Sequence, residues 1–333
     1  MNYKKKVFLS ITLLLILVFA GCDNNNKTYS LKIDTIGEGN VVKKPNKEVY
    51  KKNDKVSLEA IPARGYEFAF WEGSIKNTKP EPVIIMDKDK HLKANFGQKY
   101  YFQNFKYEDE ILDEIFLNDD DLVIKAEITN EKYALTMKKT NLFTRIKPFQ
   151  QEHFHFPVDF YGEVDLEFGK TDSYTVAGFH FGELEFDYIT TDYNSEKDIK
   201  DNSEKDIKGK YRLLLVNTEG KYIIKETEVY ETIEEENGVK YEQYQKYNEM
   251  PIIEQGEIPG FEKDKPIKLA FSKKGDLYSF YVNGLVTEQV VDSENMKPVF
   301  YLLALHTENN RNFLEEEVTV YFDNYKILSL DSK

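Results

Sequence analysis

The chain has 333 residues, a formal net charge of −14, 41% hydrophobic residues and one cysteine. A single thiol excludes an intramolecular disulfide, so apolar cores must hold the fold, and this length predicts about two domains. The acidic excess argues against nucleic acid as a partner, because phosphate binding depends on Lys and Arg that release counterions. The same excess predicts that anionic lipid head groups repel the protein, so attachment to a membrane needs another source.

The first 21 residues have the features of an export signal. Three lysines precede the apolar stretch 7–20, which is shorter than the roughly 20 residues of a membrane-spanning helix. Ala20 and Gly21, directly before Cys22, resemble a bacterial lipobox, which implies cleavage before Cys22 and an acyl anchor such as diacylglyceryl or palmitate on this residue. We therefore expect signal peptide 1–21, a lipid bilayer as partner through Cys22, and an exported protein at the cell membrane or cell surface.

A polar tether, residues 22–28, precedes a segment with a period of two. Within residues 29–97, Val56, Leu58 and Ala60 alternate with polar residues, as half-buried strands do. The ordered stretches 35–39, 56–62, 65–68, 71–73 and 92–96 resemble the divergent internalin-type B repeat of bacterial surface proteins. This resemblance implies a small β module that acts as a stalk or adhesion spacer.

Trp71, the only tryptophan, has two interpretations. It could be a platform on which a sugar ring stacks, or a core residue of the small module. Because large aromatic side chains dominate small cores, we favour the core.

After an expected link at 97–99, residues 100–330 continue with short alternating segments. We expect insertions near 190–209, where one peptide is repeated in tandem, and near 222–262, where Asn237-Gly238 suits a type I′ hairpin turn. An acidic stretch at 107–121 has apolar residues at helical spacing, but its charge could equally mark a loop.

Residues 100–330 also resemble a second family. The stretches 211–222, 276–284 and 318–325 occur in the order found in the concanavalin A-like lectin and glucanase superfamily, which is close to laminin G-like domains. The resemblance implies a two-sheet antiparallel jelly-roll sandwich, so the expected fold class is all-β. It does not decide function, because this fold hosts lectins, hydrolases and adhesion modules.

The sharpest chemical candidate is the segment 162–168, in which the period of a strand places Glu163, Asp165 and Glu167 on one face. Laminarinase-type glycoside hydrolases of this fold use such a strand. By that resemblance Glu163 would be the nucleophile, Asp165 would orient it, and Glu167 would be the acid/base. A retaining mechanism needs the two glutamate carboxyls about 5–5.5 Å apart, whereas Cα atoms four residues apart on a strand are separated by about 13 Å. The alternative is a solvated acidic face, which we favour.

No metal site is expected. His153 and His155 share a predicted strand face but have no local third ligand. Asp119, Asp120 and Asp121 could contribute oxygens to calcium, yet their spacing matches no EF-hand loop. No other cofactor is expected.

Together these features predict a non-catalytic envelope lipoprotein. Cys22 would anchor it, module 29–97 would act as the spacer, and the jelly roll would bind a polysaccharide or an envelope protein. The first alternative is a glycan hydrolase that uses Glu163, Asp165 and Glu167. The second is a structural envelope scaffold without a small ligand.

Overall fold

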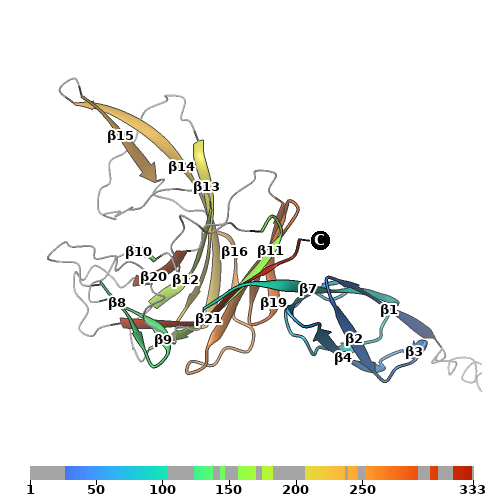
Figure 1. Ribbon diagram of the computed structural model, residues 1–333. Coiled ribbons are helices and arrows are strands. Elements are labelled where there is room, and N and C mark those ends of the chain that lie inside the picture. The colour runs from blue at the N-terminus through green and yellow to red at the C-terminus, as the bar shows by residue number, and fades with distance from the viewer. Residues whose placement is uncertain are drawn as a thin grey trace, which may run out of the picture.

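The computed structural model describes residues 27–103, 124–137, 143–146, 157–169, 175–182, 207–236, 239–246, 252–291, 301–306 and 318–331. All regular elements in these ranges are β-strands, which confirms the all-β fold class (Figure 1). In the same ranges no helix is long and apolar enough to cross a membrane. Cys22, the stretch 107–121 with Asp119, Asp120 and Asp121, the pair His153 and His155, and most of the tandem copy lie outside the described residues.

The first seven strands form a small two-layer module, called the module below. They are β1 (Thr28–Ile36), β2 (Gly39–Lys44), β3 (Val49–Lys51), β4 (Lys55–Pro62), β5 (Tyr66–Gly73), β6 (Val83–Ile85) and β7 (Lys90–Gln103). Strands β2, β4 and β6 form one sheet, and β3, β1, β7 and β5 form the other. All pairs are antiparallel except β1 with β7, which is parallel.

The alternating residues of the module form its core as predicted. Val56, Leu58 and Ala60 of β4 are buried while their neighbours are mostly exposed, because successive side chains of a strand point to opposite faces. Trp71 is 1% exposed within this core, and its indole nitrogen donates to the carbonyl of Lys79 at 2.9 Å. The core interpretation of Trp71 is therefore confirmed.

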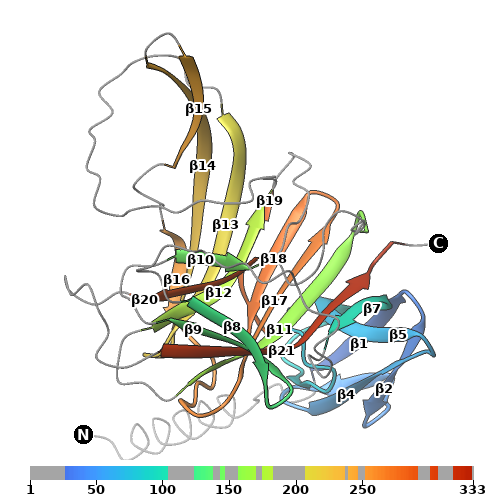
Figure 2. The same ribbon diagram turned by 60° about the vertical axis from the view of Figure 1, so that its left-hand side comes forward.

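The remaining strands form a two-sheet sandwich, called the sandwich below. They are β8 (Ile124–Thr129), β9 (Lys132–Met137), β10 (Phe143–Ile146), β11 (Phe160–Phe168), β12 (Thr175–Gly182), β13 (Ile207–Asn217), β14 (Lys221–Glu236), β15 (Val239–Lys246), β16 (Ile252–Glu257), β17 (Ile267–Lys274), β18 (Leu277–Val282), β19 (Leu285–Val291), β20 (Tyr301–His306) and β21 (Val318–Ser329). One sheet has the order β19-β18-β17-β11-β21, with β9 beside β21 and β8 beside β9. The other has the order β10-β20-β12-β13-β14-β15, with β16 beside β14 (Figure 2).

The main core lies between these two sheets. Val164 and Leu166 of β11 and Phe271 of β17 pack from one sheet, while Phe179 and Leu214 pack from the other. The strand pairs within the sandwich are antiparallel, as predicted for a two-sheet sandwich.

The link expected at 97–99 is not a separate segment, and that prediction is wrong. Strand β7 runs without interruption through these residues, pairs with β5 up to Gln98, and pairs with β21 from Gln98 to Gln103. Figure 1 shows β7 extending from the module into the sandwich. The sheet of the module and one sheet of the sandwich are therefore a single hydrogen-bonded sheet.

The long hairpin predicted around 237–238 is confirmed, because β14 pairs with β15 from Val229 to Glu236. The first part of β14 lies within the insertion expected near 222–262, but it is not an insertion. It pairs with β13, and its Ile224 is buried in the main core, so this part belongs to the sandwich itself.

Candidate functional site

The acidic strand predicted from the sequence is β11, which lies between β17 and β21 in the sandwich. Val164 and Leu166 point into the main core, so Glu163, Asp165 and Glu167 share the opposite face. The pairing with β21 shifts register between Glu163 and Asp165, and such a bulge bends a strand. The predicted common face is therefore present, and we call it the acidic face.

Glu163 is enclosed by two hydrogen-bond donors, Tyr161 and Lys268, and by a further ion pair with Lys326. The Tyr161 hydroxyl donates to Oε2 at 2.5 Å, and the ammonium groups of Lys268 and Lys326 lie 2.9 and 3.1 Å from Oε1. Burial alone would raise the pKa of this carboxyl, since Glu163 is 8% exposed. The charges of Lys326 and Lys268 outweigh burial and hold the pKa of Glu163 below its ordinary value.

Asp165 and Glu167 are also paired. Lys268 Nζ lies 2.8 Å from Asp165 Oδ1, and the side-chain amide of Asn324 donates to Asp165 Oδ2 at 2.9 Å. Glu167 instead pairs with Lys132, whose Nζ lies 2.6 Å from Oε2. The structure thus joins Glu163 and Asp165 through one ammonium, while Glu167 has a separate partner.

This arrangement restricts what the three carboxylates can do chemically. A nucleophilic carboxylate must approach an anomeric carbon, and an acid/base must reach the glycosidic oxygen. In Glu163 both oxygens already accept hydrogen bonds, and in Glu167 the ammonium of Lys132 occupies one oxygen. Each predicted catalytic group would have to leave its cationic partner before it could act.

One end of the acidic face is covered by the module. Phe70 of β5 is 4% exposed and lies against Tyr161 of β11 and Tyr281 of β18, with ring centroids 6.1 and 6.0 Å apart. Ala69, Ala270 and Leu328 complete this buried cluster. Strands β11 and β17 consequently bury residues on both faces, which explains why Ala270 is buried as well as its core-facing neighbours.

Ion pairs surround this junction and connect it to the acidic face. Lys326 lies 2.8 Å from Glu67 of the module as well as beside Glu163. Lys274 of β17 contacts Glu72 at 3.0 Å and the buried side chain of Asn95 at 3.1 Å. One lysine therefore links the module directly to the acidic strand.

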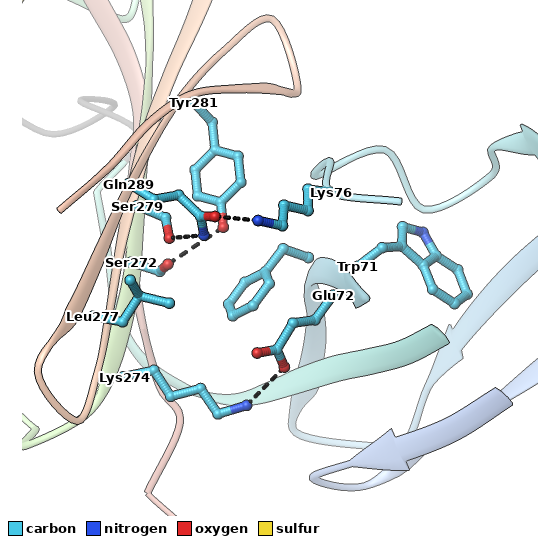
Figure 3. A pocket seen from close by; sticks show the side chains of 10 residues that line it. Trp71, Glu72, Lys76, Ser272, Lys274, Leu277, Ser279, Tyr281 and Gln289 are labelled. Atoms are coloured by element: carbon cyan, nitrogen blue, oxygen red, sulfur yellow. Dashed lines mark hydrogen bonds and ion pairs between the residues drawn. The ribbon is translucent and has the colours of Figure 1, made fainter. Parts of the chain in front are cut away.

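A small cavity lies beside the junction. Its polar lining includes Ser272, Ser279, Tyr281, Gln289 and Lys76, and Lys76 donates to Gln289 across it (Figure 3). The cavity measures about 20 Å³, which is room for about one water molecule and far less than a sugar ring needs. It belongs to the junction between the module and the sandwich.

The described residues contain no group of three or more His, Cys, Asp or Glu side chains that could bind a metal ion. On the acidic face, Lys268 lies between Glu163 and Asp165, and Lys132 pairs with Glu167.

Sequence reasoning missed the lysines that pair with the acidic strand. Lys268 could have been placed on this face, because it alternates with the core residues Ile267 and Leu269 on β17. Lys326 likewise alternates with the core residues Tyr325 and Ile327 on β21. The local pattern does not indicate the partner of any of these lysines, since pairing of distant strands brings them to the acidic face.

Comparisons with known proteins support one of the two resemblances directly. Residues 29–100 match the family model of the Divergent InlB B-repeat domain, which confirms the internalin-type resemblance for the module. A search of curated proteins finds no match to the chain.

Several solved structures are similar at low identity. The carbohydrate-binding module CBM66 from Bacillus subtilis is 13% identical, with 63% of this chain and 96% of that chain covered and a TM-score of 0.36. The β-glucanase of Bacillus licheniformis is 10% identical, with coverage of 69% and 97% and a TM-score of 0.38. A Bacillus subtilis protein of unknown function with a galectin-like fold is 12% identical, with coverage of 70% and 96% and a TM-score of 0.36.

Proposed function

We propose that this chain is an exported, lipid-anchored envelope protein whose sandwich binds a glycan or a protein without catalysis. The observation that carries the proposal is the state of Glu163, which is 8% exposed, accepts hydrogen bonds from Tyr161 and Lys268, and forms an ion pair with Lys326. A buried carboxylate that has two hydrogen-bond donors and two ammonium partners is typical of a structural ion-pair network. The acidic strand then stabilises the face instead of cleaving a substrate.

The uncovered part of the acidic face supplies the binding surface. Asp165, Glu167 and Lys132 are partly exposed there, and they offer acceptors and a donor for the hydroxyl groups of a sugar or the amides of a protein. Phe102 of β7 is 56% exposed and lies opposite Lys326 in the strand register, which places it on the same face. An exposed aromatic ring beside polar groups suits stacking on a sugar ring.

Binding is tested with a glycan array and with envelope proteins captured on the purified chain. We expect Phe102→Ala to weaken binding at least several-fold, since an aromatic contact contributes about 0.5–1.5 kcal/mol beyond its buried area. The control is Val291→Ala, which truncates an exposed apolar side chain on the edge strand β19. Equal binding by Phe102→Ala and wild type would contradict this assignment of the surface. Capture of no glycan and no protein would favour the scaffold alternative.

The hydrolase alternative rests on one observation, the common face of Glu163, Asp165 and Glu167. It is tested by release of reducing ends from β-glucans by wild type and by Glu163→Gln. We expect no release from either protein. Release by wild type that Glu163→Gln abolishes would establish hydrolysis and overturn the proposal.

The anchor is tested separately. Cys22→Ser should move the protein out of a membrane fraction that has been washed in about 1 M salt, which removes electrostatic contacts, and globomycin, which blocks lipoprotein signal cleavage, should make the precursor accumulate. Unchanged processing in globomycin would refute lipid attachment at Cys22 without affecting the assignment of the binding face.

A further inference from the structure

Charge is distributed very unevenly along the chain. Residues 29–100 contain 14 Lys and Arg against 10 Asp and Glu, a net charge of +4. Residues 101–333 contain 27 Lys and Arg against 48 Asp and Glu, a net charge of −21. The net charge of the whole chain therefore conceals a basic module joined to a strongly acidic sandwich, and the repulsion expected from anionic lipids applies to the sandwich.

The excess of lysine is concentrated at one end of the module, which we call the basic end and define as residues 27–30, 51–55 and 86–90. Thr28 pairs with Lys51 in the strand register, and Lys55 pairs with Ile85. The turn amide of Asn53 donates to the carbonyl of Met86 at 2.7 Å. These contacts bring three segments together, and they contain six Lys against three Asp.

The aspartates at the basic end are engaged, while most of the lysines are not. Asp54 pairs with Lys47 at 3.2 Å, Asp87 pairs with Lys90 at 2.6 Å, and Asp89 accepts from the Ser30 amide at 2.7 Å. Lys51, Lys52, Lys55 and Lys88 are exposed, and within the described residues none of them forms an ion pair. Four cationic side chains at this end are thus available to an anionic partner.

Apolar side chains accompany these lysines. Ile85 and Val83 of β6 are 51% and 61% exposed, because β6 directs only Ile84 into the module core. Ile85 lies directly opposite Lys55. A mixture of exposed aliphatic and ammonium groups suits an interface that is apolar below and anionic at its surface, as in a phospholipid layer.

The basic end and the acidic sandwich lie at opposite ends of β7. Lys90 belongs to the basic end and begins β7, whereas the last residues of β7 pair with β21 of the sandwich (Figure 1). A strand of this length spans about 45 Å, and the Debye length at physiological salt is about 8 Å. Ions in solution therefore screen most of the repulsion between the sandwich and a surface that contacts the basic end.

We propose that the basic end of the module binds a lipid surface with anionic head groups. Charge complementarity identifies this partner, and the short tether, residues 22–28, would keep the basic end within reach of the membrane. Cys22 is separated from Thr28 by six peptide steps, which span about 20 Å at most. The reach of the tether depends on the proposed anchor at Cys22, whereas binding by the basic end does not depend on acylation.

The test uses residues 22–333 with Cys22→Ser, so that no acyl chain contributes to binding. We expect this protein to sediment with vesicles of phosphatidylglycerol and phosphatidylcholine but not with phosphatidylcholine alone. Binding should disappear between about 0.1 M and about 1 M salt, over which the Debye length falls from about 10 to about 3 Å. Failure to bind the anionic vesicles at the lower salt would refute the proposal and leave the Cys22 anchor as a separate question.

Two charge reversals identify the surface. Lys52→Glu with Lys88→Glu should weaken binding to anionic vesicles about tenfold or more, because each basic residue near such a surface contributes about fivefold. The control, Lys263→Glu with Lys265→Glu, makes the same change in net charge at exposed turn positions of the sandwich. Equal losses for the two double variants would show a non-specific charge effect and overturn the proposal.

A soluble polyanion distinguishes a lipid surface from an anionic polymer. Polyglutamate at equal charge should compete poorly with the vesicles, and Ile85→Ser should weaken binding to vesicles while leaving binding to polyglutamate unchanged. Full competition by polyglutamate together with no effect of Ile85→Ser would assign the basic end to a polymeric anion and reject the lipid.

Discussion

Replacing Phe70 should reveal whether the module and the sandwich unfold as one unit. This side chain is 4% exposed and contacts the rings of Tyr161 and Tyr281 across the junction. Truncation of a buried phenylalanine to alanine costs about 3–5 kcal/mol, because apolar burial is lost and a cavity remains. We expect Phe70→Ala to lower the free energy of unfolding by that amount, and Phe70→Leu by about 1 kcal/mol, since it retains most of the volume.

Urea unfolding should be followed by two signals. Fluorescence of Trp71, the only tryptophan, reports on the module, and far-ultraviolet circular dichroism reports mainly on the larger sandwich. If the two parts are coupled, Tyr281→Leu in the sandwich should lower the urea midpoint of both signals together. A double-mutant cycle of Phe70→Leu with Tyr281→Leu should give a coupling energy of about 0.5–1.5 kcal/mol.

The control cycle combines Phe70→Leu with Leu214→Val. Leu214 is buried on the other sheet of the sandwich and belongs to a different cluster from Phe70, so the two effects should add within about 0.5 kcal/mol. Coupling of the two parts is refuted if Tyr281→Leu moves the circular dichroism transition but leaves the Trp71 transition in place. The module would then be an independent spacer despite the continuous strand β7.

Three further predictions concern the acidic face and the sandwich core. The pKa of Glu163 is held below its ordinary value of 4.5 in the folded state, so the contribution of this carboxylate to stability should be complete above about pH 4.5 and should be lost as the pH falls below that value. Urea midpoints measured between about pH 7 and about pH 3 should show this loss of stability, and the loss should be smaller in Glu163→Gln. Tyr161→Phe removes the hydroxyl donor to this carboxylate and should cost about 1.5–3 kcal/mol of unfolding free energy, whereas an unchanged urea midpoint would contradict the hydrogen bond. Gly178→Ala would place a Cβ 1.9 Å from the carbonyl oxygen of Leu214, so it should disrupt pairing of β12 with β13 and lower the melting temperature. The decrease should exceed that of Gly275→Ala, because a Cβ at exposed Gly275 meets no atom within 4 Å and only its positive φ opposes the substitution.

The sequence by itself determined the local features of this protein. Alternation with a period of two placed Val56, Leu58 and Ala60 in one core and put Glu163, Asp165 and Glu167 on one face, because neighbouring side chains of a strand point in opposite directions. The core position of Trp71 and the antiparallel pairing of β14 with β15 were also predicted, from residue size and from the Asn237-Gly238 pair in the sequence. The motifs of residues 29–100 were specific enough to identify the module.

Tertiary structure alone decided the environment of those residues. Glu163 meets Lys268, 105 residues away, and Lys326 meets Glu67, 259 residues away, because strand pairing joins segments whose separation leaves no trace in local periodicity. The same pairing makes residues 97–99 part of β7 and lets Phe70 cover Tyr161. A strand pattern gives the direction of a side chain, but the opposing side chain depends on the order of strands in the folded sheet.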